Sequence, residues 1–419
     1  MDKLKAIIVG AGSRGTLYTK IMLEMPEKYE VIAVADPIEG RRKQIQSLCN
    51  LPDEMCFADW RPLLALGKIA DIAVIATMDR DHTEPTMKAI ELKYDILLEK
   101  PISPEPAECK RIAEAAEKNG VKIVVCHVLR YTPFFRTLKK IIDDGRIGDI
   151  ISVNHEECVG DRHQSHSFVR GNWGNSQRSS FMLLQKSCHD IDILQWLIGK
   201  KCKKVQSFGS LTYFTEKNAP AGSPQYCLEG CPAEETCPYH AGKIYLEGKY
   251  WFKNKCTKEP NPTDEMKREA LMTTQFGKCI FKCDNDVVDH QTVNMLFEDD
   301  ITVTFTMCAF NKGGRFIHIM GTKGEVYGDM NASLVELYDF MTETKVQVPV
   351  DSVEDALGGH GGGDVWIVKT LYDYVKGIDK DPSISEARIS YENHMIVFAA
   401  EDARKNGTII DMDAYEAQL

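Results

Sequence analysis

The chain has 419 residues, of which 43% are hydrophobic and 27% are charged. This length exceeds one ordinary hydrophobic core, so two domains are expected, and the composition argues against large-scale disorder. Acidic residues outnumber basic ones by 62 to 51, which gives a formal net charge of −11. Nucleic acids and anionic membrane surfaces bind concentrated basic surfaces, so neither is an expected partner.

The apolar stretch before Gly10 is too short for a signal sequence or a membrane span, and no later stretch reaches that length. The fourteen cysteines lack the dense, regular spacing of a small secreted fold. We therefore expect reduced thiols and a cytoplasmic protein without a membrane partner.

Short apolar runs alternate with amphipathic stretches through the first third of the chain, a pattern typical of strands and crossover helices in a doubly wound parallel sheet. We predict an α/β fold with an N-terminal Rossmann domain over residues 1–127. Its expected strands lie in residues 5–10, 30–36, 70–77, 94–101 and 121–127, and its expected helices in 14–23, 40–49, 83–92 and 105–119.

After Tyr131, strand-like runs with period-2 character follow one another, which indicates an antiparallel sheet with helices on one face. We predict a second α/β domain over residues 128–419, with a large, mostly antiparallel open sheet and a cysteine-rich insertion at about 215–261. The expected strands are 150–159, 205–214, 287–297, 301–310 and 315–321, and the expected helices are 187–198, 364–376 and 390–406.

A G-x-G-x-x-G string, Gly10-Ala11-Gly12-Ser13-Arg14-Gly15, lies between the first expected strand and helix. Its glycines permit a tight turn, close approach of a pyrophosphate and helix–strand packing, and the helix N-terminus offers free N–H groups. Asp36 ends the next strand, 21 residues after Gly15, where a carboxylate accepts hydrogen bonds from ribose hydroxyls. Asp36 favours NAD over NADP, although Arg41 and Arg42 keep NADP open.

Polar residues also follow two later strands of this domain, Ala76-Thr77 and Glu99-Lys100-Pro101. The carboxyl ends of parallel strands form the edge at which doubly wound folds bind ligands. We expect Thr77, His82, Glu99 and Lys100 to line the cofactor site. Lys100 is placed to hold a substrate hydroxyl or carbonyl beside the nicotinamide.

In order and spacing, these motifs resemble the Gfo/Idh/MocA oxidoreductase family over nearly the whole chain. The resemblance continues through Arg130-Tyr131-Thr132-Pro133, Gly145-Arg146-Ile147-Gly148, Cys188-His189-Asp190-Ile191-Asp192 and His360-Gly361-Gly362-Gly363-Asp364. It implies a Rossmann domain, a second domain whose open sheet often serves as an oligomer interface, a nicotinamide cofactor and a sugar, cyclitol or glycoside substrate. A homo-oligomer, dimer or tetramer, is therefore expected.

The resemblance also implies that Lys100 and His189 flank the reacting hydroxyl as catalytic residues. Many family members carry an aspartate four residues before this histidine, where this chain has Gln185. Glutamine can orient a hydroxyl but cannot take its proton, and the adjacent Lys186 is a basic alternative. His189 is the preferred proton acceptor.

Further polar and aromatic residues are concentrated in 161–173, and a smaller group lies at 286–291. An aromatic ring among hydrogen-bonding groups suits a sugar, although a solvated surface loop would have the same composition. The substrate residues predicted here are Tyr131, Arg162, His163, His166, Trp173, Gln185 and His290.

Closely spaced cysteines lie in and after the insertion. Thiolate and imidazole ligands would suit a structural zinc ion or an iron–sulfur cluster, but the spacing is not the usual knuckle, and ordinary thiols are the alternative. The metal ligands considered are Cys227, Cys231, Cys237, His240 and Cys279.

Together these patterns predict an NAD-dependent oxidoreductase that acts on a hydroxyl-bearing carbon of a sugar, cyclitol or glycoside. One alternative is a glycosidase that oxidises its substrate transiently, eliminates the aglycone and returns the hydride. Another is a non-catalytic sensor that binds dinucleotide or sugar.

Overall fold

A computed structural model describes residues 2–259, 261–351 and 360–418. Its N-terminal part contains a six-stranded, fully parallel sheet with the order β3-β2-β1-β4-β5-β6. This order reverses direction at β1, so the predicted doubly wound sheet is confirmed. The strands are β1 Leu4–Val9, β2 Tyr29–Ala35, β3 Cys56–Phe57, β4 Ile72–Ile75, β5 Asp95–Leu98 and β6 Ile123–Val125.

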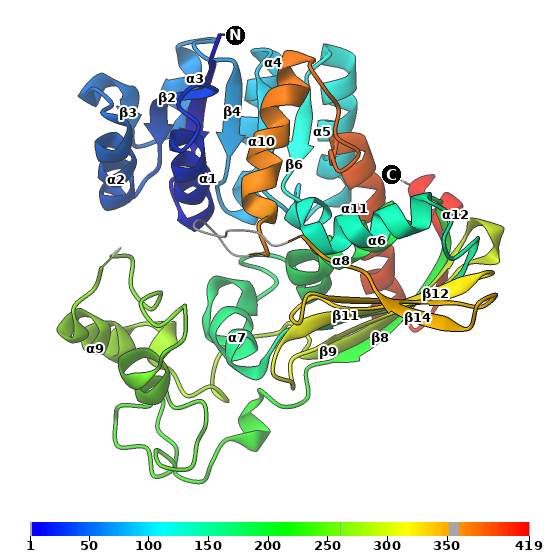
Figure 1. The fold of residues 1–419 in the computed structure, drawn as a ribbon. Coiled ribbons are helices and arrows are strands. Elements are labelled where there is room, and N and C mark those ends of the chain that lie inside the picture. Colours follow the sequence, from blue (N-terminus) through cyan, green and yellow to red (C-terminus); the bar gives the residue numbers. More distant parts are fainter. Residues whose placement is uncertain (1, 260, 352–359, 419) are drawn as a thin grey trace.

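Helices cover both faces of this sheet: α1 Ser13–Leu23, α2 Glu39–Cys49, α3 Trp60–Ala65, α4 Thr83–Glu91 and α5 Pro106–Asn119. A distant helix, α10 Gly363–Lys376, packs beside α1 (Figure 1). Its buried residues Ile367, Val368 and Leu371 share a core with Leu4 and Ile8 of β1. The chain thus returns to the Rossmann sheet late in the sequence.

The second sheet has nine strands in the order β14-β13-β12-β11-β7-β10-β9-β8-β15. Neighbouring strands are antiparallel except β7 and β10, which pair in parallel. The predicted mostly antiparallel sheet is therefore confirmed. The strands are β7 Ile150–Cys158, β8 Cys202–Ser210, β9 His290–Phe297, β10 Thr302–Cys308, β11 Gly314–Gly321, β12 Gly324–Asp329, β13 Leu334–Asp339, β14 Thr344–Gln347 and β15 Ile409–Asp411.

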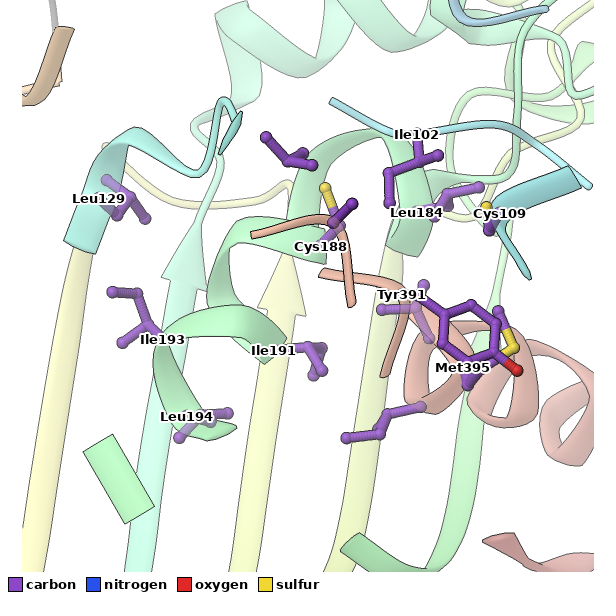
Figure 2. Close-up of a cluster of buried hydrophobic side chains, with 14 of the residues drawn as sticks. Ile102, Cys109, Leu129, Leu184, Cys188, Ile191, Ile193, Leu194, Tyr391 and Met395 are labelled. Carbon is purple, nitrogen blue, oxygen red and sulfur yellow. The ribbon is translucent and has the colours of Figure 1, made fainter. Parts of the chain in front are cut away.

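One face of this sheet is covered by α6 Pro133–Asp143, α8 Met182–Ile198 and α11 Ala387–Asn406, and α12 Met412–Glu416 follows β15 (Figure 1). Figure 2 shows the packing of α8 on α11, where Cys188 and Ile191 lie beside Tyr391 and Met395. These side chains are buried, so the helix that carries His189 is held in the middle of the main hydrophobic core.

Most observed element boundaries lie within three residues of the sequence prediction, and the two largest differences are in α8 and β8. Helix α8 begins at Met182 instead of residue 187, because the strong helix formers Leu183, Leu184 and Gln185 extend it toward its N-terminus. Strand β8 ends at Ser210 instead of residue 214, because the backbone N–H groups of Thr212 and Tyr213 turn to donate to the Asp289 carboxylate.

The cysteine-rich segment forms a separate lobe around α9 Asp264–Thr273, below α1 and α2 in Figure 1. It has two small cores of its own. One includes Cys227 and Tyr245, and the other includes Tyr239 and Cys279, so the lobe continues past residue 261. Within the described ranges, no helix combines the length and apolar character that a membrane crossing requires.

Candidate active site

The glycine turn after β1 is shaped by backbone contacts. Gly10 has a φ of +93°, and a Cβ there would lie 2.4 Å from the Ala76 carbonyl oxygen. A Cβ on Gly15 would lie 1.9 Å from the carbonyl oxygen of Gly10. A Cβ on Gly12 would meet only Arg41 Nη1, at 3.7 Å. The first and third glycines are therefore required by packing, whereas the space at Gly12 is open to a ligand.

The residues around the turn fit a dinucleotide. Gly12 is the N-cap of α1 and supplies no side-chain cap, so the first N–H groups of the helix, from Ser13 on, are available to phosphate oxygens. Asp36 is buried at the end of β2, where its carboxylate accepts from Ala11 N at 2.7 Å and Ile38 N at 2.8 Å. The carboxylate is thus fixed beside the turn, with lone pairs remaining for ribose hydroxyls.

The Arg14 side chain, expected at the cofactor, is bonded within the protein. Its Nε donates to Glu99 Oε1 at 2.6 Å and its Nη2 to Asp364 Oδ1 at 2.6 Å, with Tyr18 as a further partner. Glu99 also accepts from the Tyr18 hydroxyl at 2.7 Å. The guanidinium and the Glu99 carboxylate therefore connect α1, the end of β5 and the start of α10.

Thr77 and His82 connect the ends of β4 and β5. His82 is buried, with Nδ1 2.7 Å from the Pro101 carbonyl oxygen and Nε2 3.3 Å from that of Thr77. The Thr77 hydroxyl donates to the Asp81 carbonyl oxygen at 3.0 Å. The predicted cofactor role of these two residues stays a prediction, and the structure shows that they brace the edge that carries Lys100.

Lys100 and His189 come together across the two domains. Lys100 Nζ donates to the Gln185 carbonyl oxygen at 2.6 Å, in the first turn of α8. His189 follows one turn later on the same side of the helix. It is 6% exposed, and its Nδ1 has no hydrogen-bond partner among the described residues.

The surroundings of His189 keep its imidazole neutral. Burial lowers the pKa of His189 well below its ordinary value, and the positive charge of Lys100 lowers it further. A neutral imidazole has a free lone pair and can accept a proton. The neutral ring of His189 therefore offers a free lone pair near the Lys100 ammonium group.

A second histidine, His127, lies behind His189 and was missed by the sequence analysis. Its ring is edge-on to His189 at 5.8 Å and to His394 at 5.6 Å. It is fully buried, and neither ring nitrogen has a hydrogen-bond partner within the described part of the chain. Its position directly after the apolar run of β6, at the ligand-binding edge of the sheet, was the available signal.

Lys186 belongs to a buried network of charges. Its Nζ lies 2.9 Å from Glu157 Oε1, and Arg315 bridges Glu157 at 2.5 Å and Asp190 at 2.9 Å. Arg315 and Glu157 are directly opposite each other on β11 and β7. Burial lowers the pKa of Lys186, although Glu157 opposes the shift. Lys186 is thus already paired, unlike His189.

Two of the predicted substrate residues, Tyr131 and His166, are built into packed regions. The Tyr131 hydroxyl is fully buried, 3.4 Å from the Ser385 hydroxyl. His166 stacks on Phe252 with ring centroids 4.3 Å apart, and its Nδ1 bonds the Tyr245 hydroxyl at 2.8 Å. The hydrogen bonds and packing contacts of both side chains are thus made within the protein and do not require a substrate.

The other predicted substrate residues are dispersed. Burial lowers the pKa of His163 well below its ordinary value, and the positive charge of Lys186 lowers it further. His163 therefore lies near the charged network that contains Lys186. Arg162 Nε donates to the Tyr250 hydroxyl at 3.1 Å, and Trp173 Nε1 is buried without a partner among the described residues. His290 bonds Asp289 at 2.8 Å, and its side chain is 43% exposed.

The predicted zinc site is not supported. Among the described residues, no group of three or more His, Cys, Asp or Glu side chains is arranged to hold a metal ion. Cys227 Sγ lies 3.6 Å from Arg170 Nη2, and His240 Nε2 donates to the carbonyl oxygen of Cys227 at 2.9 Å. Burial raises the pKa of both Cys227 and Cys237. Cys231 and Cys279 join no metal-binding group either.

Comparison with known proteins places both halves of the chain in one family. The model of an oxidoreductase family with an NAD-binding Rossmann fold matches residues 4–127, and that of its C-terminal alpha/beta domain matches residues 139–409. A putative oxidoreductase, YteT of Bacillus subtilis, is 25% identical over 405 residues, which cover 90% of this chain and 89% of the relative.

Other relatives match over about half of their own length. An inositol 2-dehydrogenase of Salmonella paratyphi B is 27% identical over 49% of this chain and 57% of the relative. A 2,7-anhydro-N-acetylneuraminate hydratase of Mediterraneibacter gnavus is 27% identical over 48% of this chain and 51% of the relative.

Among solved structures, levoglucosan dehydrogenase in complex with NADH and L-sorbose aligns over 98% of this chain and 99% of its own, with a TM-score of 0.72 and 16% identity. At this identity the likeness establishes the fold. The two family models together span most of the sequence, and this chain belongs to the Gfo/Idh/MocA family of NAD-binding oxidoreductases.

Proposed function

We propose that this protein moves a hydride between NAD and a hydroxyl-bearing carbon of a sugar or cyclitol. The observation that carries the proposal is the pair formed by Lys100 and His189 at the carboxyl edge of the Rossmann sheet, where the imidazole is neutral and its Nδ1 has no hydrogen-bond partner among the described residues. Relatives whose names specify inositol or an anhydro sugar support this substrate class.

When bound, NAD accepts the hydride from the reacting carbon. His189 takes the hydroxyl proton, because its neutral imidazole has a free lone pair close to the Lys100 ammonium group that would hold the hydroxyl oxygen. Lys100 has three N–H donors. One is used by the Gln185 carbonyl oxygen, and the others can hold the hydroxyl oxygen. Lys186 is paired with the Glu157 carboxylate, which also binds Arg315.

Gln185 occupies the position at which many members of the family have an aspartate. Its backbone carbonyl group and its side chain are given separate roles here. The carbonyl oxygen fixes Lys100, while the amide side chain is free to orient a substrate hydroxyl without taking its proton. Proton removal therefore falls to His189. We also propose that NAD is preferred over NADP, because the buried Asp36 carboxylate would oppose a 2′-phosphate.

The test is reduction of NAD with myo-inositol, levoglucosan and L-sorbose as probes, in H189Q and K100M beside the unaltered protein. A positioned base typically contributes ~10²–10⁴-fold, so both variants should lose turnover on that scale. The affinity for NAD, measured by calorimetry, should stay unchanged, because neither side chain contacts the glycine turn. Full turnover in both variants would refute the proposed site.

A redox-neutral reaction is the second candidate, favoured by the hydratase relative and by a further histidine, the partly exposed His360, beside the buried His189. In that reaction the substrate is oxidised, loses or gains a group at a neighbouring carbon and regains its hydride. The two candidates differ in one observable. A dehydrogenase accumulates NADH in step with product, whereas the redox-neutral enzyme turns over without net NADH.

We further propose a cytoplasmic homo-oligomer. All fourteen cysteines are free thiols in the described structure, as a reducing compartment would maintain. Exposed apolar side chains, including Ile151 and Phe208, lie on strands of the nine-stranded sheet. Sedimentation of the purified chain should give a dimer or tetramer, and a monomer at all concentrations would contradict this part.

A further inference from the structure

The segment His360-Gly361-Gly362-Gly363-Asp364 precedes and opens α10, and the reaction proposed above gives it no role. Here His360 Nδ1 lies 3.0 Å from Asp364 Oδ2. The Asp364 side chain is fully buried, and Arg14 holds its other oxygen at 2.6 Å. Burial alone would raise the pKa of Asp364, but the hydrogen bond from His360 and the charge of Arg14 outweigh it and keep that pKa below its ordinary value.

The backbone of this turn is specialised. His360, Gly361 and Gly362 have φ values of 63°, 57° and 83°, so three consecutive residues are left-handed and only His360 carries a Cβ. A Cβ on Gly363 would lie 2.1 Å from the Val128 carbonyl oxygen, which shows how closely the turn is pressed against the domain crossover. A non-glycine residue in this conformation is uncommon, and such residues cluster at functional sites.

The turn places the His360 ring beside His189. The ring centroids are 6.1 Å apart, and the His360 side chain is 40% exposed, whereas His189 is almost fully buried. The charged and titratable groups around this pair are Lys100, His127 and Arg315 on the His189 side, and Asp364 and Arg14 behind His360. His360 is thus the accessible member of the pair.

The bond to Asp364 also fixes which nitrogen of His360 carries hydrogen. An ionised carboxylate only accepts, so Nδ1 must donate, and in the neutral ring Nε2 then has a free lone pair. A carboxylate behind an imidazole stabilises the imidazolium that forms when the ring takes a proton. The arrangement is that of a second base at the same site.

We propose that His360, oriented by Asp364, transfers the proton of the C–H bond adjacent to the carbon that NAD oxidises. This rests on the proposed function, in which NAD takes the hydride and His189 takes the hydroxyl proton to leave a ketone. The neighbouring C–H bond then breaks, its electron pair forms the enolate, and the proton moves to His360 Nε2. Reversal returns a proton to the carbon, so a solvent deuteron enters there.

The first test does not depend on turnover. In protein labelled with ¹⁵N in histidine, the His360 side-chain signals are identified by their loss in H360Q. The unaltered protein should show protonated Nδ1 and unprotonated Nε2 for this residue, and D364N should abolish that preference. The opposite tautomer, or the same tautomer in D364N, would overturn the dyad.

The second test measures exchange in deuterium oxide with NAD and levoglucosan or myo-inositol. The unaltered protein should incorporate deuterium next to the oxidised carbon, and H360Q should lose this exchange at least tenfold while still reducing NAD. D364N should lose it similarly, and the double variant should be no worse than H360Q, because both residues act through one imidazole. His318, which bonds Glu325 Oε2 at 2.9 Å on β11, gives the matched control H318Q, with unchanged exchange.

The two proposals fail in distinguishable ways. Exchange that persists in H360Q, or NAD reduction without any exchange in the unaltered protein, would overturn the role of His360 and leave the oxidoreductase proposal intact. Failure of the unaltered protein to reduce NAD with every probe would count against the proposed substrates, and the tautomer of His360 would still decide the dyad.

Discussion

The glycine turn and the cysteine-rich lobe both contain dense sequence motifs, yet only one of them has the structure that its motif predicts. At the turn, Gly10 and Gly15 must be glycines, because a Cβ on either residue would lie only 2.4 or 1.9 Å, respectively, from a backbone carbonyl oxygen. In the lobe, cysteines pack in two small apolar cores around the buried Arg170. The backbone conformation of a glycine turn is determined largely by residues close to it in the sequence. A metal site, in contrast, forms only where side chains from distant parts of the sequence converge.

The largest expected effect belongs to the turn. Replacement G15A places a Cβ against the Gly10 carbonyl oxygen and should destabilise the protein by about 3 kcal/mol, at the upper end of overpacking. G12A meets only Arg41 and should fold normally, but should weaken NAD binding by roughly tenfold, or about 1.4 kcal/mol. Thermal unfolding and calorimetric titration separate the two effects. Equal stability losses would show that Gly12 also serves packing.

The lobe should depend on Arg170 instead of a metal. Arg170 donates to the carbonyl oxygens of Lys278 and Tyr239 at 2.9 Å each. R170M leaves these buried acceptors unpaired and should cost about 2–4 kcal/mol. Incubation with a chelator should leave the unfolding temperature of the unaltered protein unchanged. A lower unfolding temperature after chelation, together with stoichiometric metal in the untreated protein, would instead support a structural metal site in the lobe.

His166 makes the same lobe sensitive to acid. Burial, together with the smaller effects of the positive charges of Arg170 and Lys255, lowers the pKa of His166 from 6.5 to about 3. As the pH falls through 6.5, the unfolded imidazole takes up a proton and the folded one does not. Stability is therefore lost between pH 6.5 and about 3, at ~1.4 kcal/mol per pH unit.

The variant H166F should lose this acid sensitivity. Between about pH 7 and about pH 5, its unfolding free energy should fall by ~2 kcal/mol less than that of the unaltered protein. Denaturant unfolding at the two pH values measures this difference. Equal losses in both proteins would show that His166 is not buried as described.

The smallest effect concerns cofactor choice. D36S removes the carboxylate that accepts from Ala11 and Ile38 and would face a 2′-phosphate. We expect the preference for NAD over NADP to narrow by roughly tenfold, which corresponds to about 1.4 kcal/mol. Tighter binding of NADP than of NAD by the unaltered protein would contradict the role given to Asp36.

The sequence was sufficient to predict the parallel sheet, the open sheet and the glycine turn. The sheets follow from the local periodicity of apolar residues, and the turn follows from the backbone conformations that only glycine allows. The sequence was insufficient for β12, β13 and β14. Two of the three buried positions of β12 are glycines, β13 buries only Val335 and Leu337, and β14 is exposed throughout, so the apolar alternation is weak. The sequence also could not reveal the ion pairs of the Arg14 guanidinium, because their carboxylate partners, Glu99 and Asp364, lie far along the chain.

The residues of the candidate site also differ in how well the sequence could predict them. Lys100 and His189 could be found because they stand in recognisable motifs. His127 and His360 could not be assigned, because their importance lies in ring-to-ring distances of 5.8 and 6.1 Å from His189. The pairing of Lys186 with Glu157 likewise depends on the register of β7 against β11, which no local pattern specifies.

Hydride transfer to NAD at the proposed Lys100 and His189 site can be measured directly. The measurement is a single turnover with a sugar or cyclitol probe deuterated at its hydroxyl-bearing carbons, followed by mass spectrometry of the nicotinamide. We expect deuterium on the nicotinamide for the unaltered protein and H318Q, and none in the same interval for H189Q. Equal labelling with H189Q, or binding of NAD and sugar with no labelling in any protein, would contradict this proposal.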